Sequence, residues 1–331
     1  MKQKPLYLLL RIFLFVIVFV FISCADKHNR TITIGIPDGP STVSFIKMIN
    51  QPPVIDGCEV KFIIKSDPSQ IETMMMQNKL DFAVLPTVMA ANLYNKRVDY
   101  RLVAIPIWGT LYLATNDSTI NNTEQLHKQT VHIFGQGATA DILLQKYLQN
   151  NSMQKVKIDY RYNSNQEIAM ALLHKKIKFA VISEPQMSIL LSKDSNIQIL
   201  TEITCEEKDV PFNKNIFTQT AFLVNNRLFV KNRKLVEAVS LAYAESCNFT
   251  SHHTDEAAKL LLKHGYYPDL ITAFRSIPLC NIHYVPAIEI KDKVYRYLDI
   301  FYKAQPKSVG GKFPDENFII SAENALILPD L

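Results

Sequence analysis

Short apolar runs rich in β-branched residues alternate with amphipathic stretches over the first third of the chain. The run at 31–37 predicts a strand. A polar turn at 38–42 follows, and 43–50 predicts a helix capped by Ser41 or Thr42. Further strands are expected at 60–64, 82–86 and 100–105, with helices at 68–78 and 87–94. This alternation is typical of a mainly parallel sheet with helices on both faces.

The same alternation of strands and helices begins again after an apolar strand at 108–115. The second set is expected to hold strands at 130–134, 157–162, 179–182 and 197–203, and helices at 140–149, 165–174 and 184–191. A strand at 219–225 follows this set. The remaining pattern is largely helical, at 234–247, 254–263, 268–276 and 286–304.

The two strand-helix sets predict two lobes. The strand at 108–115 leads into the second set, and the strand at 219–225 leads back out of it. Two crossing strands of this kind are the natural hinge of a two-lobed protein. We therefore expect an α/β protein in which residues 31–112 and 222–331 form lobe one, and residues 113–221 form lobe two.

The first 24 residues resemble a bacterial lipoprotein signal. Lys2 and Lys4 precede an apolar stretch, and its uninterrupted part, 12–22, is well short of the roughly 20 residues that span a bilayer. Phe-Ile-Ser-Cys then ends at Cys24, with Phe21 where such signals usually carry Leu. The resemblance implies a cleaved signal peptide at 1–23, a lipidated Cys24 and a linker at 24–30. An uncleaved membrane anchor is the alternative, and both place the rest of the chain outside the cytoplasm.

Charge and cysteine content narrow the function further. Of 36 Lys and Arg residues, three lie before residue 12, which leaves 33 against 31 acidic residues. Such a balance, without a basic stripe, argues against a nucleic-acid partner. The cysteines beyond Cys24 are far apart and show no metal-binding spacing, and their pairing is left open: Cys58, Cys205, Cys247 and Cys280. We see no catalytic, cofactor or metal motif.

An ordered series of short motifs is similar to the NitT/TauT-type substrate-binding lipoproteins of ABC importers, which bind nitrate, sulfonates, taurine or thiamine-pyrimidine precursors. The motifs are IGIPDGPST at 34–42, NKLDFAVLPT at 78–87, WGTLYLA at 108–114, FGQGAT at 134–139, SEPQ at 183–186 and PKSVGGKFPDE at 306–316. The resemblance implies a type II periplasmic-binding-protein fold and a monomer in the cell envelope. It also implies a small-molecule solute, and a membrane permease with its ATPase as partners.

Ligands of open α/β sheets bind beyond the carboxyl ends of the strands. The candidate ligand-binding residues are therefore Asp38, Ser41, Thr42, Pro86, Thr87, Trp108 and Gly109 in lobe one, and Gly137, Ala138, Thr139 and Glu184 in lobe two. The glycine loop before a helix offers unpaired N–H groups to an anionic group or a neutral acceptor. The absence of Arg from these loops favours a neutral, zwitterionic or heteroaromatic solute over a dianion.

Each candidate has a structural alternative. Ser41, Thr42 and Thr139 would also serve as helix caps. Trp108 would stack on a ligand or pack in the core. Glu184 would bind a cationic or hydrogen-donating group, or lie in the first turn of a helix, where the dipole favours a carboxylate.

Two other functions stay open. Menaquinone-pathway dehydratases and thiamine-pyrimidine synthases resemble this architecture, so an enzyme is the main alternative. Those enzymes are expected in the cytoplasm, and the lipoprotein signal counts against them. A surface adhesin is the third possibility.

Overall fold

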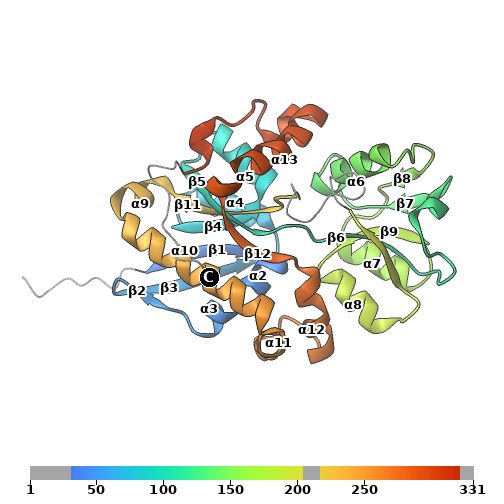
Figure 1. The fold of residues 1–331 in the computed structure, drawn as a ribbon, viewed down its shortest axis with the longest axis horizontal. Coiled ribbons are helices and arrows are strands. Elements are labelled where there is room, and N and C mark those ends of the chain that lie inside the picture. Colours follow the sequence, from blue (N-terminus) through green and yellow to red (C-terminus); the bar gives the residue numbers. More distant parts are fainter. Residues whose placement is uncertain (1–30, 204–216, 321–331) are drawn as a thin grey trace, which may run out of the picture.

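The computed structural model describes residues 31–203 and 217–320, and these residues form two α/β lobes, each built on its own sheet (Figure 1). The predicted fold class is confirmed. The predicted signal peptide, Cys24, the linker and Cys205 lie outside the described residues. No helix within the described ranges is long and apolar enough to cross a membrane.

The first sheet has the strand order β12-β5-β11-β4-β1-β3-β2. Its strands are β1 Ile32–Pro37, β2 Val54–Ile55, β3 Cys58–Lys65, β4 Phe82–Pro86, β5 Tyr100–Ile107, β11 Thr220–Asn225 and β12 Ile282–Pro286. β1 pairs parallel with β3 and β4, whereas β11 runs antiparallel between β4 and β5. The strand that returns from the second lobe therefore lies in the middle of this sheet.

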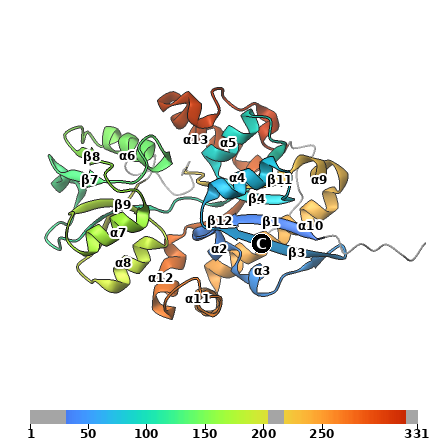
Figure 2. The same cartoon turned by 180° about the vertical axis from the view of Figure 1, so that it is seen from behind.

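Helices cover both faces of the first sheet (Figure 2). They are α2 Pro40–Ser44, α3 Ile46–Asn50, α4 Pro68–Met76, α5 Thr87–Asn95, α9 Asn226–Lys231, α10 Arg233–His252, α11 Thr254–Lys263, α12 Leu270–Leu279 and α13 Lys291–Ala304. Short 3-10 turns lie at η3 Ala287–Ile290, η4 Pro306–Val309 and η5 Glu316–Phe318.

The second sheet has the strand order β10-β6-β9-β7-β8. Its strands are β6 Leu111–Thr115, β7 Thr130–His132, β8 Lys157–Asp159, β9 Phe179–Ser183 and β10 Gln198–Glu202. Its helices are α6 Thr139–Asn150, α7 Asn165–Leu173 and α8 Gln186–Lys193, with a 3-10 turn at η1 Thr123–Leu126.

The chain passes from the first sheet to the second between Ile107 and Leu111, the end of β5 and the start of β6. It returns before Thr220, where β11 begins. The expected boundaries at 112/113 and 221/222 fall inside β6 and β11. Since each strand pairs with one sheet along its length, we propose that the lobes divide at 108–110 and ahead of Thr220.

Some local predictions were wrong. The helix expected at 43–50 is two short helices, because Pro40 starts α2 early and the chain turns at Phe45 before α3. β12 lies between the helices expected at 268–276 and 286–304 and was not predicted, since its pairing with β5 is a tertiary contact that no local pattern shows. The helix expected at 286–304 begins as the 3-10 turn η3, and α13 follows it.

The core of the first lobe contains an aromatic cluster. Phe45 stacks on Tyr243 with ring centroids 3.6 Å apart, and Phe82 stacks on Phe222 at 5.4 Å. Of the cysteines in the described ranges, Cys58, Cys247 and Cys280 are free and buried, which leaves Cys205 unassigned.

Candidate functional site

The loop after β1 is held by its own carboxylate. Asp38 is exposed, and its Oδ1 accepts hydrogen bonds from the Gly39 N–H (2.8 Å) and the Thr42 hydroxyl (3.2 Å). Ser41 and Thr42 are buried inside α2, whose N-cap is Gly39 without a side-chain capping bond. The prediction that Ser41 or Thr42 caps this helix is therefore wrong.

Pro86 ends β4 and Thr87 begins α5, at the same end of the first sheet as the loop after β1. Thr87 is buried and donates from its hydroxyl to the Thr218 carbonyl oxygen (2.6 Å). Its N–H donates to the Gln219 carbonyl oxygen at 2.9 Å. These bonds fasten the start of α5 to the segment that returns from the second lobe.

Trp108 and Gly109 form the outward crossing and are packed tightly. Trp108 is 4% exposed, and its indole N–H donates to the His283 carbonyl oxygen at 2.7 Å. The Gly109 carbonyl oxygen accepts from the Asn281 amide at 2.7 Å, and a Cβ at Gly109 would lie 2.5 Å from Phe217. These contacts favour the packing alternative for Trp108, and stacking on a ligand stays a prediction.

The glycine loop of the second lobe is occupied by a carboxylate that the sequence reasoning missed. The Gly137 N–H donates to Asp141 Oδ2 at 2.8 Å, and Asp141 Oδ1 accepts from the Gln145 amide (3.0 Å) and the Tyr160 hydroxyl (2.8 Å). Asp141 is buried in the first turn of α6. Burial, followed by the hydrogen bond to Asp141 and the charge of Asp141, raises the pKa of Tyr160 to about 12.

This arrangement changes what the loop offers a ligand. The Ala138 N–H donates to the Gly135 carbonyl oxygen at 3.0 Å, so two of the expected N–H donors have partners within the loop region. Ala138 is the N-cap of α6 and Thr139 its first residue, so the alternative in which Thr139 caps the helix is wrong. Asp141 lies within the first turn of the helix that the sequence predicts. Because the helix dipole favours a carboxylate at that end, this position was the sequence signal for its role in the loop.

Glu184 precedes α8, whose N-cap is Pro185, so the alternative of a first-turn carboxylate is wrong. Its side chain is 3% exposed; Oε2 accepts from the Ser276 hydroxyl (2.6 Å) and Oε1 from the Ser188 hydroxyl (3.0 Å). Its N–H donates to the Thr110 carbonyl oxygen at 3.1 Å. Burial raises the pKa of this carboxyl to about 7, against the effect of both serines.

The structure brings some of the predicted residues together. A Cβ at Gly39 would lie 3.6 Å from Pro185 Cδ, so the loop at 38–42 meets the loop that carries Glu184. Gln219 joins Thr87 to Thr110, whose carbonyl oxygen holds the Glu184 N–H. The loop at 137–139 lies beside a different part of the first lobe, where a Cβ at Gly137 would be 3.3 Å from Gln305 Oε1.

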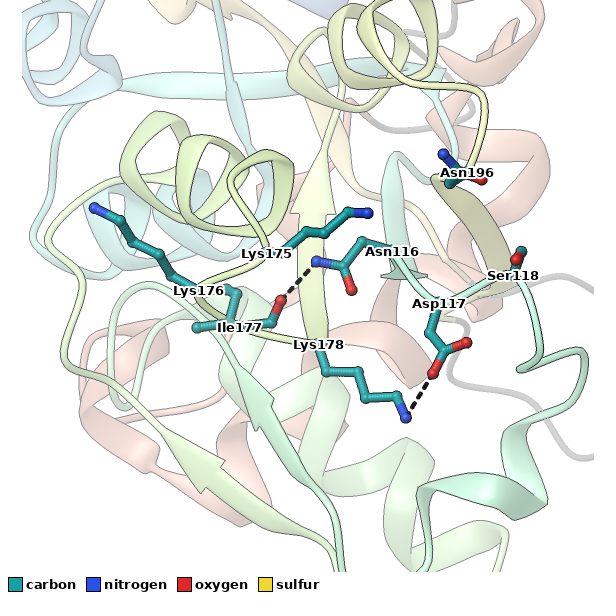
Figure 3. A pocket seen from close by; sticks show the side chains of 8 residues that line it. All are labelled: Asn116, Asp117, Ser118, Lys175, Lys176, Ile177, Lys178 and Asn196. Atoms are coloured by element: carbon teal, nitrogen blue, oxygen red, sulfur yellow. Dashed lines mark hydrogen bonds and ion pairs between the residues drawn. The ribbon is translucent and has the colours of Figure 1, made fainter.

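A pocket of about 530 Å³ lies on the second lobe and contains none of the predicted ligand-binding residues (Figure 3). Its lining is Asn116, Asp117, Ser118, Lys175, Lys176, Ile177, Lys178 and Asn196. Lys178 pairs with Asp117 at 2.7 Å, and the Asn116 amide donates to the Ile177 carbonyl oxygen at 2.8 Å. Several polar groups of the lining therefore already have an ion-pair or hydrogen-bond partner within the protein. The described part of the chain shows no cluster of side chains suited to a metal.

Comparisons with known proteins agree with this architecture. A solved structure described as an ABC transporter from Parabacteroides distasonis is 31% identical, with a TM-score of 0.78 over 88% of this chain and 99% of that one. The periplasmic aliphatic sulphonate-binding protein SsuA of Escherichia coli is 14% identical, with a TM-score of 0.68 over 91% and 93% of the two chains.

A third neighbour is the periplasmic nitrate-binding protein NrtA of Synechocystis PCC 6803, which is 12% identical with a TM-score of 0.59 over 84% of each chain. No curated protein matches the chain. The predicted resemblance to NitT/TauT-type binding proteins is confirmed. A family model described as NMT1/THI5 like matches residues 55–257, and the chain belongs to this family.

Proposed function

We propose that the protein is the extracytoplasmic solute-binding component of an ABC importer. It captures a small molecule between its two lobes and delivers it to a membrane permease, whose ATPase supplies the energy. The observation that carries the proposal is the 31% identity to an ABC transporter structure across 99% of that chain. Binding proteins for sulphonate and nitrate share the fold.

The solute is held by the loops at the carboxyl ends of the strands from both lobes. Of the predicted residues, Asp38, Pro86, Ala138 and Thr139 keep exposed or half-exposed side chains. The buried Asp141 carboxylate at the start of α6 repels an anion that approaches this helix end. This charge supports a solute that is neutral, zwitterionic or heteroaromatic.

A thermal-shift screen of the full chain tests this function. Candidate solutes are sulfonates, nitrate, pyrimidines, vitamins and amino acids. We expect one class to raise Tm without being converted, and to raise it further as its concentration increases, since a ligand that binds only the folded state stabilises it. Conversion of a solute would instead favour the enzyme alternative, and a shift with a macromolecule alone would favour an adhesin.

Thr139→Ala should lower the affinity for the solute found in that screen by about fivefold to tenfold, because it removes one hydrogen bond. Thr254→Ala is the matched control, because Thr254 is also the half-exposed first residue of a helix without a side-chain cap. Titration calorimetry compares the two variants. Equal affinities would remove Thr139 from the site.

We also propose that Cys24 carries the lipid that holds the protein, as a monomer, on the outer side of a membrane. The support is the sequence pattern alone. Cells fed a clickable fatty acid should label the wild-type chain and Cys205→Ala but not Cys24→Ala. Label that persists in Cys24→Ala would contradict lipidation at this residue.

A further inference from the structure

Two buried side chains, Glu184 and Ser276, form a hydrogen bond between the lobes, in addition to the bond from the Tyr112 hydroxyl to the Leu279 carbonyl oxygen. Glu184 belongs to the second lobe, directly after β9, and Ser276 belongs to α12. Their oxygens are 2.6 Å apart, and both side chains are buried. α12 lies against α8 of the second lobe in both views of the molecule (Figures 1 and 2).

α12 is anchored in the first lobe. Ala273, Ile277 and Cys280 pack in the core cluster that contains Phe45 and the strands of the first sheet. The Tyr267 hydroxyl lies 2.6 Å from Ser276 Oγ. Because Ser276 gives its single proton to the carboxylate, Tyr267 is the donor in that second bond. Of these two bonds at Ser276, only the bond to Glu184 crosses between the lobes, and it would break if the lobes separated.

Among the described residues, no cationic side chain pairs with Glu184, although Ser276 and Ser188 donate hydrogen bonds to its carboxylate. Within the described ranges it makes no ion pair with Lys, Arg or His, and Arg275 of α12 is exposed. The titratable groups that face it are neutral or acidic: Tyr112 of β6, which also faces Glu202 of β10, Tyr267 and Cys280 at the ends of α12, and Asp38 beyond Tyr267. From the first turn of α8, the Ser188 hydroxyl and the Ser188 N–H both donate to the Glu184 carboxylate.

We propose that Glu184 is an interlobe tie, a positioning residue whose burial against Ser276 sets the balance between joined and separated lobes and makes closure depend on pH. The proposal rests on the proposed function, in which the lobes open and close. It places Glu184 outside the set of groups that touch the solute. A buried carboxylate without a cation is costly, whereas a buried neutral carboxyl keeps its hydrogen bonds at little cost.

The direction of the pH dependence follows from burial. With the lobes joined, burial raises the pKa of Glu184 to about 7. With the lobes apart, water returns the carboxyl to its ordinary pKa of about 4.3. Closing therefore takes up a proton, so the closed form gains as pH falls through 7 and loses this gain above 7. Between pH 8 and pH 6 the ratio of closed to open molecules should rise about tenfold.

Distances between spin labels measure this ratio. Labels at Gln149→Cys on α6 and Lys303→Cys on α13 report on helices that face each other from the two lobes (Figure 1), and both native side chains are exposed. The full chain is used, with Cys24 and Cys205 replaced by Ser in every variant. Urea unfolding of each variant establishes that it folds.

In the otherwise wild-type chain we expect the short-distance population to grow as pH falls from 8 to 6. Glu184→Gln keeps the shape of the side chain and removes its charge, so the short-distance population of this variant should be independent of pH. At pH 8 this population should be at least as large as that of the wild type at pH 6. Ser276→Ala should open the lobes at pH 8. Glu245→Gln, at an exposed position of α10, is the matched control and should follow the wild-type profile.

A wild-type profile that does not change between pH 8 and pH 6, or a Glu184→Gln profile identical to it, would overturn the tie. Either result can occur while a solute still raises Tm, so it leaves the importer function standing. Conversely, lobes that respond to pH as expected without any solute in the screen would support the tie and count against that function.

Discussion

At the scale of single residues, Asp141 decides the character of the glycine loop. One carboxylate accepts from a backbone N–H, an amide and a phenol, and it lies at the positive end of α6. Each of these donors is costly to bury without a partner. The hydrogen bonds to Asp141 therefore give the loop at 137–139 a structural role in addition to any binding role.

Asp141→Ala should lower the free energy of unfolding by about 2–3 kcal/mol, because it leaves three donors without their acceptor. Glu245→Ala removes an exposed carboxylate from α10 and should change it by less than about 0.5 kcal/mol. Urea unfolding followed by circular dichroism measures both. If Asp141→Ala lowers the free energy of unfolding no more than the control does, water accepts the hydrogen bonds of the three donors as well as the carboxylate does.

At the scale of elements, β11 begins where the chain returns from the second lobe, and it completes the first sheet. All six of its residues are buried, and it pairs with β4 on one side and β5 on the other. Phe222 stacks on Phe82 and meets Tyr243 edge-on, with ring centroids 4.8 Å apart. The strand therefore links sheet pairing to the packing of α10.

Phe222→Ala should lower the free energy of unfolding by about 3–5 kcal/mol, since it leaves a cavity among three aromatic rings. Phe222→Leu should lose less than the alanine variant because it refills part of that volume. Val230→Ala, at a side chain that is 76% exposed, is the control and should have little effect. Equal losses for Ala and Leu would indicate that stacking, rather than volume, matters here.

At the scale of the whole molecule, the reactivity of two buried thiols reports on unfolding of the first lobe. Cys247 lies in α10 and Cys280 follows α12, both in the core of the first lobe. Burial raises the pKa of both thiols, which suppresses the reactive thiolate. Their reaction with a reagent in water therefore requires that the first lobe unfold.

With Cys24, Cys58 and Cys205 replaced by Ser, the chain should react with a disulfide reagent no faster than it unfolds, and urea should accelerate the reaction. Val230→Cys in the same background should react at once. Absorbance of the released thiolate gives both rates. Fast reaction of the parent chain would show that the first lobe opens locally around α10 or α12.

The sequence by itself determined what depends on neighbours along the chain: the alternation of strand and helix, the two sets and their order, and a family resemblance that the comparisons confirm. Hydrophobic periodicity and turn residues are local, so they are legible without a fold. Only the tertiary structure decided the pairing of β12 with β5, the burial of Trp108, and the partners of Asp141 and Glu184. Ser276 is 92 residues from Glu184 along the chain, and no local pattern predicts a hydrogen bond that exists because two lobes meet.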